Sequence, residues 1–254
     1  MRAISAAVVL VVAAIATTAC QDGGHREAVP ASSSSSVAGR DNGVSSLAAK
    51  EIAIRAGQAI HNVPVHMHGT IPDRSLGATT LDLISNGSDE GRCTNQGGGE
   101  TIDMLRVGGK EYVRASASAW MRTGLPALSS AAAATRADGK YVRAPIGRLE
   151  LVRLTHFLDA GQVLADELPG TETATKGGTA IINGVPTVAI TAVTPGTSPL
   201  PIGTVYVATV GEPYVMQWDS PGGAGIFVYS YYMKPFVIEA PPADQVIDLD
   251  DLLT

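Results

Sequence analysis

Apolar and polar residues alternate with a period of two along much of the chain, and this pattern predicts many short β-strands. In Val63 to Ile71 the odd positions are apolar and the even positions polar, as in a strand with one covered face and one wet face. Pro64, near the start of this strand, favours an edge position in the sheet. Pairs such as Asn86-Gly87 and Gly108-Gly109 indicate tight turns between strands.

The same reasoning predicts about eleven strands in two sets. The first set is Val63 to Ile71, Thr79 to Ile84, Gly91 to Gln96, Thr101 to Val107 and Lys110 to Ala115. The second set is Lys176 to Ile182, Val185 to Thr191, Thr204 to Thr209, Pro213 to Asp219, Ile226 to Tyr231 and Phe236 to Glu239. Because consecutive strands lie within hairpin distance, we expect an antiparallel sheet.

Three segments have the period of a helix. Leu47 to Ile60 carries an apolar stripe behind the possible caps Ser45 and Ser46, Pro126 to Ala137 is rich in alanine, and Leu149 to Leu168 spaces its leucines by three or four. Strands, then helices, then strands predict the α+β class. We expect one strongly curved antiparallel sheet wrapped around these few helices, which cover its apolar face.

The N-terminus has the pattern of an export signal. An apolar run from Ala3 to Ala16 follows Arg2 and is too short to span a membrane. The next residues, Thr17-Thr18-Ala19-Cys20, resemble the bacterial lipobox, although that box usually has leucine in place of Thr17. The resemblance implies a diacylglyceryl group on Cys20, and the alternative is an ordinary signal cut near Ala19.

These features divide the chain into three parts. We expect a signal peptide over residues 1–19, a disordered tether over residues 20–46 and a single domain over residues 47–254. The tether contains the serine run Ser32 to Ser36 and cannot bury enough apolar surface to fold. Two or three acyl chains on Cys20 would hold the protein at the extracytoplasmic face of the cell membrane.

Charge and cysteine content exclude several classes of protein. The net charge is −6, and no cluster of Lys or Arg is present, so we expect no nucleic-acid partner. Cys20 and Cys93 are the only cysteines, so an acylated Cys20 leaves no internal disulfide. We expect Cys93 to be a half-buried strand residue and the protein to be a monomer.

The sequence contains no recognisable catalytic motif. Gly-x-Ser-x-Gly, Cys-x-x-Cys and a phosphate-binding glycine loop are all absent. His66 and His68 share a strand face and could bind a metal with His61 or Asp82, but we interpret them as solvent-facing residues. The acidic residues from Asp248 to Asp251 are interpreted as an exposed tail. We therefore expect no catalytic residue, no metal and no cofactor.

Several local phrases resemble exported lipoproteins of the LppX/LprG type, which are related to the Lol-type lipoprotein carriers. These phrases are Val65 to Thr70, Ile102 to Val113, Ala119-Trp120, Asn183 to Val188 and Ile238 to Leu249. The resemblance covers the chain after the tether. It implies an unclosed β-barrel around helices, with an apolar cavity that holds the acyl chains of a lipid or lipidated molecule.

The residues themselves leave both a hollow and a solid core open, because an inward apolar face fits either. Only three Phe and two Trp are present, and this scarcity of large rings favours a cavity. The predicted ligand residues are Leu81, Leu83, Leu105, Val107, Val113, Trp120, Leu154, Leu158, Val205, Val207 and Trp218. The leading hypothesis is a membrane-anchored lipid carrier, and the alternatives are a non-enzymatic surface module with a filled core and, more remotely, an exported hydrolase.

Overall fold

A computed structural model describes residues 39–73, 77–87, 89–125, 128–148, 151, 154–161, 163, 174–193 and 201–252. They belong to one compact unit that spans residues 36–254. The predicted signal peptide, Cys20 and the predicted tether as far as residue 38 lie outside the described residues. Within the described part, no helix is both long and apolar enough to cross a membrane.

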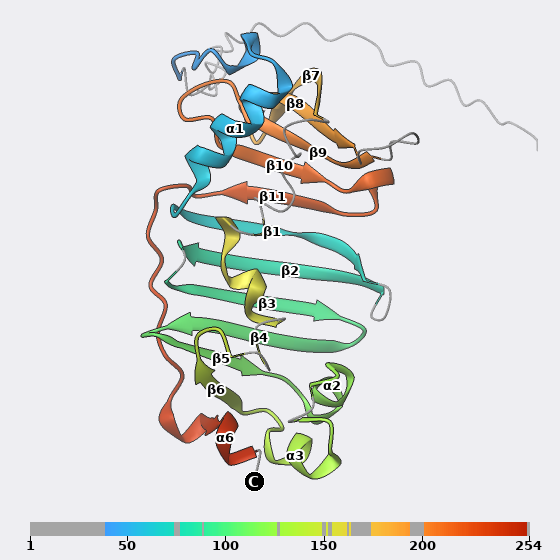
Figure 1. Cartoon of the computed structure of the whole chain (residues 1–254), viewed down its shortest axis with the longest axis vertical. Helices are drawn as coiled ribbons and strands as arrows, with labels where there is room; N and C mark the ends of the chain where they lie inside the picture. The colour runs from blue at the N-terminus through green and yellow to red at the C-terminus, as the bar shows by residue number, and fades with distance from the viewer. Residues whose placement is uncertain are drawn as a thin grey trace, which may run out of the picture. The chain divides into compact units, whose positions relative to one another are not determined.

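The described strands form one sheet of twelve (Figure 1). Their bounds are β1 Pro64–Asp73, β2 Gly77–Asn86, β3 Gly91–Gly97, β4 Glu100–Val107, β5 Lys110–Arg114, β6 Tyr141–Pro145, β7 Thr175–Ile182, β8 Val185–Val193, β9 Pro201–Ala208, β10 Val215–Asp219, β11 Ile226–Ser230 and β12 Val246–Asp248. The spatial order is β12-β6-β5-β4-β3-β2-β1-β11-β10-β9-β8-β7. Because β12 and β7 are its two edges, the sheet is not closed, and the predicted α+β class is confirmed.

Almost all neighbours in this sheet are antiparallel, and only β12 and β6 run parallel. The two sets of strands join where β1 pairs with β11. Since β1 also pairs with β2, it lies in the middle of the sheet, and the edge position predicted from Pro64 is wrong. Pro64 is the first residue of β1, a position where the missing backbone N–H is tolerated.

The helices are short. Their bounds are η1 Val44–Ser46, α1 Ala49–Ile60, α2 Ala117–Arg122, α3 Ala131–Arg136, η3 His156–Leu158, η4 Pro221–Gly223, η5 Ala243–Gln245 and α6 Leu249–Leu252. In α1 the apolar stripe is buried as the sequence predicts, through Ala49, Ile52, Ala53, Ala56 and Ile60. At its start the backbone N–H of Ala48 donates to Glu51 Oε2 at 3.3 Å, which satisfies one of the free donors of the first turn.

The face of the sheet that carries Met67, Leu83, Cys93, Met104 and Val113 is called the inner face here. α1 packs against β7 and β8, and η3 packs against β2, β3 and β4. Figure 1 shows α1 crossing one half of the sheet and the segment that contains η3, in yellow, crossing the other half. The helices therefore cover the apolar face, as the period-two pattern requires.

Three segments differ from the sequence prediction. Phe236 to Glu239 is an extended connection outside the sheet, whereas Tyr141–Pro145 and Val246–Asp248 are strands that the sequence did not indicate. Near the start of the described chain, Val44 is fully buried, and Asp41 forms a β-bridge with Val210. Part of the segment assigned to the tether thus packs on the folded unit.

Candidate functional site

An apolar row crosses the inner face through directly paired strand positions. Seven side chains follow one another from β11 to β6, each at most 1% exposed: Tyr229, Met67, Leu83, Cys93, Met104, Val113 and Val142. A second row on the same face runs through Val205, Trp218, Phe227, Gly69, Leu81, Asn95 and Ile102. Together the rows make an apolar surface that spans both halves of the sheet.

Most of the predicted ligand residues come together on this surface or in its cover. Leu81, Leu83, Val113, Trp120, Leu158, Val205, Val207 and Trp218 belong to one hydrophobic cluster, and Leu154 packs against it half-buried. Trp120 is fully buried and Trp218 is 6% exposed, so both are core residues in this structure. Their role in holding a ligand stays a prediction.

Leu105 and Val107 lie on the opposite face and are corrected here. The Gly108-Gly109 hairpin pairs Met104 with Val113 and Leu105 with Tyr112. Because successive residues of a strand point to opposite faces, this register turns Leu105 and Val107 away from the inner face. Leu105 is still buried at 6% exposure, so its apolar character alone could not reveal its direction.

Two glycines let neighbouring groups approach the inner face closely. A Cβ on Gly91 would lie 2.5 Å from the carbonyl oxygen of Leu158, so only glycine allows the end of η3 to rest on β3. A Cβ on Gly69 would lie 2.5 Å from the Phe227 ring. Because these two glycines have no side chain, the end of η3 and the Phe227 ring can lie close to the backbone of the sheet.

A buried ion pair fastens η3 to the inner face. Glu111 is 1% exposed and is paired across the strands with Arg106, whose Nη2 donates to Glu111 Oε1 at 2.8 Å. The hydroxyl of Thr155, on the turn before η3, donates to Glu111 Oε2 at 3.0 Å. Both carboxylate oxygens are therefore bound, as a charge in an apolar interior requires.

The helix α2, which carries Trp120, is held by Glu100 at the start of β4. The hydroxyls of Ser116 and Ser118 donate to the two oxygens of Glu100 at 2.5 and 2.6 Å, and Arg122 pairs with it at 2.8 Å. These bonds, with Ser116 first, lower the pKa of the Glu100 carboxyl to about 2. The anchor places the Trp120 ring in the hydrophobic cluster.

Several buried polar atoms on this side of the sheet have no hydrogen-bond partner among the described residues. They are Thr79 Oγ1, Asn95 Oδ1, Trp120 Nε1 and Trp218 Nε1. Asn95 pairs with Leu81 in the second row, and Thr79 lies two residues before Leu81 on the same face. Unpaired buried polar atoms are uncommon in a solid protein core, so these atoms are candidates for contact with a ligand or with water.

The opposite face carries His66 and His68. Asp82 lies between them, with Oδ1 2.9 Å from His66 Nε2 and Oδ2 3.7 Å from His68 Nδ1. Both His68 and Asp82 border an open hollow of about 450 Å³. Among the described residues, no group of three or more His, Cys, Asp or Glu side chains could hold a metal ion.

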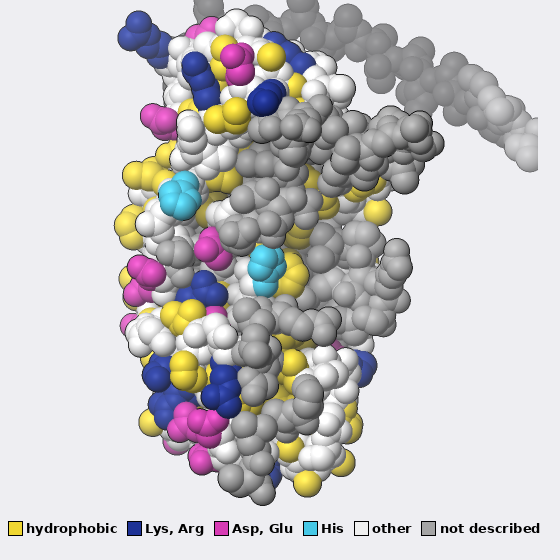
Figure 2. Space-filling view, viewed as in Figure 1, with side chains coloured by type: hydrophobic (Ala, Val, Ile, Leu, Met, Phe, Trp, Pro, Cys, Tyr) yellow, Lys and Arg dark blue, Asp and Glu magenta, His cyan; other side chains and the backbone are white. Residues whose placement is uncertain are grey.

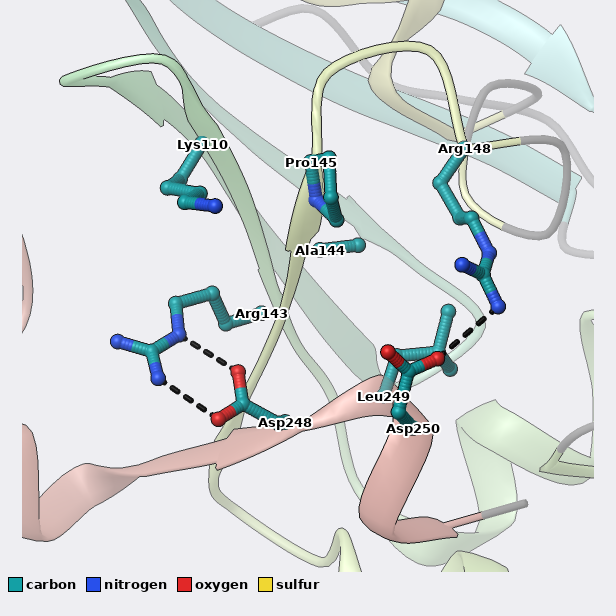
Figure 3. A pocket seen from close by; sticks show the side chains of 8 residues that line it. All are labelled: Lys110, Arg143, Ala144, Pro145, Arg148, Asp248, Leu249 and Asp250. Atoms are coloured by element: carbon teal, nitrogen blue, oxygen red, sulfur yellow. Dashed lines mark hydrogen bonds and ion pairs between the residues drawn. The ribbon is translucent and has the colours of Figure 1, made fainter.

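A shallow pocket of about 440 Å³ lies where β5, β6 and the C-terminal segment meet (Figure 3). Arg143 binds both oxygens of Asp248 at 2.7 Å, and Arg148 binds Asp250 at 3.0 Å. The hydrogen bond from Arg143 lowers the pKa of Asp248. In the acidic tail seen in the sequence, the carboxylates of Asp248 and Asp250 are therefore paired with arginines.

Cys93 lies at the centre of the first row and is fully buried. Burial, with smaller contributions from Asp82 and Asp103, raises the pKa of its thiol to about 12. The thiol stays protonated and inaccessible at neutral pH, so it packs as an apolar residue. It is more buried than the half-buried strand residue that the sequence predicts.

The sequence reasoning missed the Arg106 and Glu111 pair. The sequence did contain a signal for this pair. Arg106 is two residues after Met104 and Glu111 is two residues before Val113, so their side chains point to the same face of the sheet. A charged residue at an inward position on each of two strands joined by a hairpin indicates a buried cross-strand pair. Cys20, the predicted lipidation site, lies outside the described residues.

No protein family matches the chain, and no curated protein does. LprF from Mycobacterium bovis is 15% identical, with 76% of this chain and 96% of that one covered and a TM-score of 0.45. Lipoprotein LppX from Mycobacterium tuberculosis is 14% identical, with 75% and 97% covered and a TM-score of 0.43.

A LolA-superfamily protein from Nitrosomonas europaea is 11% identical, with 82% of this chain and 98% of that one covered and a TM-score of 0.25. These values are low in identity and modest in fold similarity. The structural neighbours of this chain are lipoproteins of the LppX/LprG type and proteins of the LolA superfamily.

Proposed function

We propose that this protein is a membrane-anchored lipoprotein of the cell envelope that binds a lipid or another apolar ligand between the inner face and its helical cover. The bound molecule makes no bond to the protein and undergoes no reaction. The protein acts as a carrier or a holder, and its N-terminal acyl chains on Cys20 keep it at the extracytoplasmic face of the membrane.

One observation carries this proposal. The inner face is apolar across both halves of the sheet, yet it holds buried polar atoms of Asn95, Thr79 and Trp218 without partners among the described residues. An aliphatic surface suits acyl chains, and unpaired donors and acceptors suit the ester, amide or hydroxyl group of an amphipathic molecule. The local phrases that resemble LppX/LprG-type lipoproteins point to the same class of ligand.

A second candidate is a surface module with a filled core and no ligand. It is favoured by both rows of the inner face, because Leu83, Cys93 and Val113 in the first row and Leu81 and Val205 in the second are fully buried without any ligand. The two candidates differ in whether a ligand enters between the second row and its helical cover. That difference can be measured.

The test enlarges one side chain on each face of the sheet. Leu81→Trp adds volume to the second row of the inner face, and Val107→Trp adds a similar volume on the opposite face as the control. Full-length chains are purified, and bound lipid is extracted and identified by mass spectrometry. If a ligand enters there, wild type and V107W carry lipid, and L81W carries none.

A filled core gives the opposite result. Wild type then carries no lipid, and L81W is destabilised by about 1–3 kcal/mol in urea unfolding because the core is overpacked. The anchor is tested separately by mass analysis of the mature N-terminus. An acylated Cys20 supports the membrane location, and an unmodified one removes it.

A further inference from the structure

The segment between β11 and η5 displays apolar side chains to solvent in alternation. Tyr231, Met233 and Val237 are 58%, 61% and 84% exposed, and Pro235 between them is also exposed. These four residues are called the apolar strip. Of the residues between them, Tyr232 and Phe236 are half-buried and Lys234 is exposed. The segment is thus two-sided, with apolar groups on the side that faces water.

The buried side of the segment is fixed firmly to the sheet. The Tyr232 hydroxyl donates to the Val215 carbonyl at 2.5 Å, and its ring stacks on Tyr214 at 4.1 Å. The side-chain amide of Asn86 donates to the Phe236 carbonyl and accepts from the Phe236 N–H, each at 2.8 Å. The outward direction of the apolar strip is therefore imposed by the fold.

The backbone of the strip is strained where it turns outward. Tyr231 and Met233 have φ angles of 55° and 61°, in the left-handed region that bulky residues rarely occupy. Held conformations of this kind cost free energy and concentrate at sites with a role in binding. Both strained residues also present their side chains to solvent.

The strip lies at the end of the sheet where α1 joins β1. The N–H of Met233 donates to the carbonyl of Pro64, the first residue of β1, at 3.0 Å. Figure 2 shows hydrophobic side chains along the left margin of the view, the side on which Figure 1 draws the connection from β11 to η5. The Tyr231 ring lies 5.9 Å from the ring of His66, so the strip begins at this end of the sheet beside the opposite face.

We propose that the apolar strip docks on the surface of a lipid bilayer. Tyrosine is favoured at the membrane interface, and methionine and valine can enter it. Lys234 stands among them, with its ammonium 5.4 Å from the centre of the Tyr231 ring, where it can meet an anionic lipid headgroup. A standard protein interface takes about 20–30 residues a side, so a strip of four residues suits a membrane better.

The length of chain before the folded unit permits this contact. The residues from Cys20 to Gly39 would reach about 60–70 Å when fully extended, so a chain anchored at Cys20 can bring any face to the bilayer. This inference rests on the proposed membrane location. It adds a defined orientation, in which the end of the sheet where α1 joins β1 meets the lipids from which a ligand would come.

The experiment places a polarity-sensitive dye on the strip of the full-length protein. Met233→Cys is labelled and compared with Ile181→Cys, which is 73% exposed but lies on the edge strand β7. Buried Cys93 takes no dye. In vesicles of phosphatidylcholine and phosphatidylglycerol, we expect blue-shifted emission at position 233, and we expect brominated lipid to quench it several-fold more strongly than at position 181.

Equal quenching at the two positions overturns the proposal. It is also overturned if the emission at position 233 shifts only when a second protein is added to the vesicles. Adding Tyr231→Asp to M233C should abolish the shift, because a carboxylate is disfavoured in the interface, and a circular dichroism spectrum checks that the variant is folded. An unchanged shift in that variant also overturns the proposal. If Cys20 carries no acyl group, it takes dye and its mass reveals this, so failure of the anchor is distinguished from failure of the strip.

Discussion

At the scale of single residues, the buried pair of Arg106 and Glu111 controls how the cover is held. Replacing Glu111 alone by leucine removes the carboxylate that binds the Arg106 guanidinium, whose side chain is 13% exposed, and we expect a loss of about 3–5 kcal/mol in the free energy of unfolding. The double variant Arg106→Met with Glu111→Leu should recover most of this loss, because no buried charge remains.

Urea unfolding of the single and double variants measures this difference. Asp250→Ala provides the control, since it breaks a pair whose carboxylate is 74% exposed, and we expect a change of at most about 1 kcal/mol. Equal destabilisation in the single and double variants would contradict the importance of the pair.

Cys93 gives a second residue-scale prediction, on pH. Its thiol has a folded pKa of about 12, whereas the unfolded chain releases the proton above about pH 8.5. The stabilisation is complete below the unfolded pKa and is lost as the pH rises towards the folded pKa, by about 1.4 kcal/mol per unit over this range. Cys93→Ala should lose this slope.

The slope is measured as the difference between wild type and C93A in urea unfolding at several alkaline pH values. Tyrosines titrate in the same range, but they are common to both chains and cancel in the comparison. Parallel curves for the two chains would show that the thiol is accessible in the folded state.

At the scale of elements, the C-terminal segment forms one edge of the sheet. β12 pairs in parallel with β6, and Leu249 in α6 is 2% exposed against β6 and β12. Leu249→Ala should cost about 2–5 kcal/mol and should reduce the protection of the β6 amides in hydrogen exchange. Met121→Ala, at a position 48% exposed in α2, is the control and should leave β6 protected.

Element prediction from sequence succeeded where local signals were strong and failed where pairing was distant. The strands on either side of the hairpin turns Gly108-Gly109 and Asn183-Gly184 have the bounds predicted from the sequence to within two residues. Phe236 to Glu239 has a strand-like composition but lies outside the sheet. Its place is decided by the side chain of Asn86, a partner 150 residues away in the chain.

At the scale of the whole molecule, the sequence predicted an α+β fold with a curved sheet of about eleven strands, and the structure has an unclosed sheet of twelve. The number is close because two strands were missed and one was added in error. The missed pair, β6 and β12, is parallel and joins residues such as Val142 and Ile247. No turn links them, so no local signal could reveal them.

The sequence by itself determined the existence of most strands, the turns between them and the apolar side of α1, because these depend on residues within a few positions of one another. Only the tertiary structure decided that Leu105 and Val107 face away from the inner face, that η3 is the element that covers Glu111, and that Tyr231 and Met233 face solvent. Each of these depends on strand register or on a partner far along the chain, and a shift of one residue reverses the direction of every side chain in a strand.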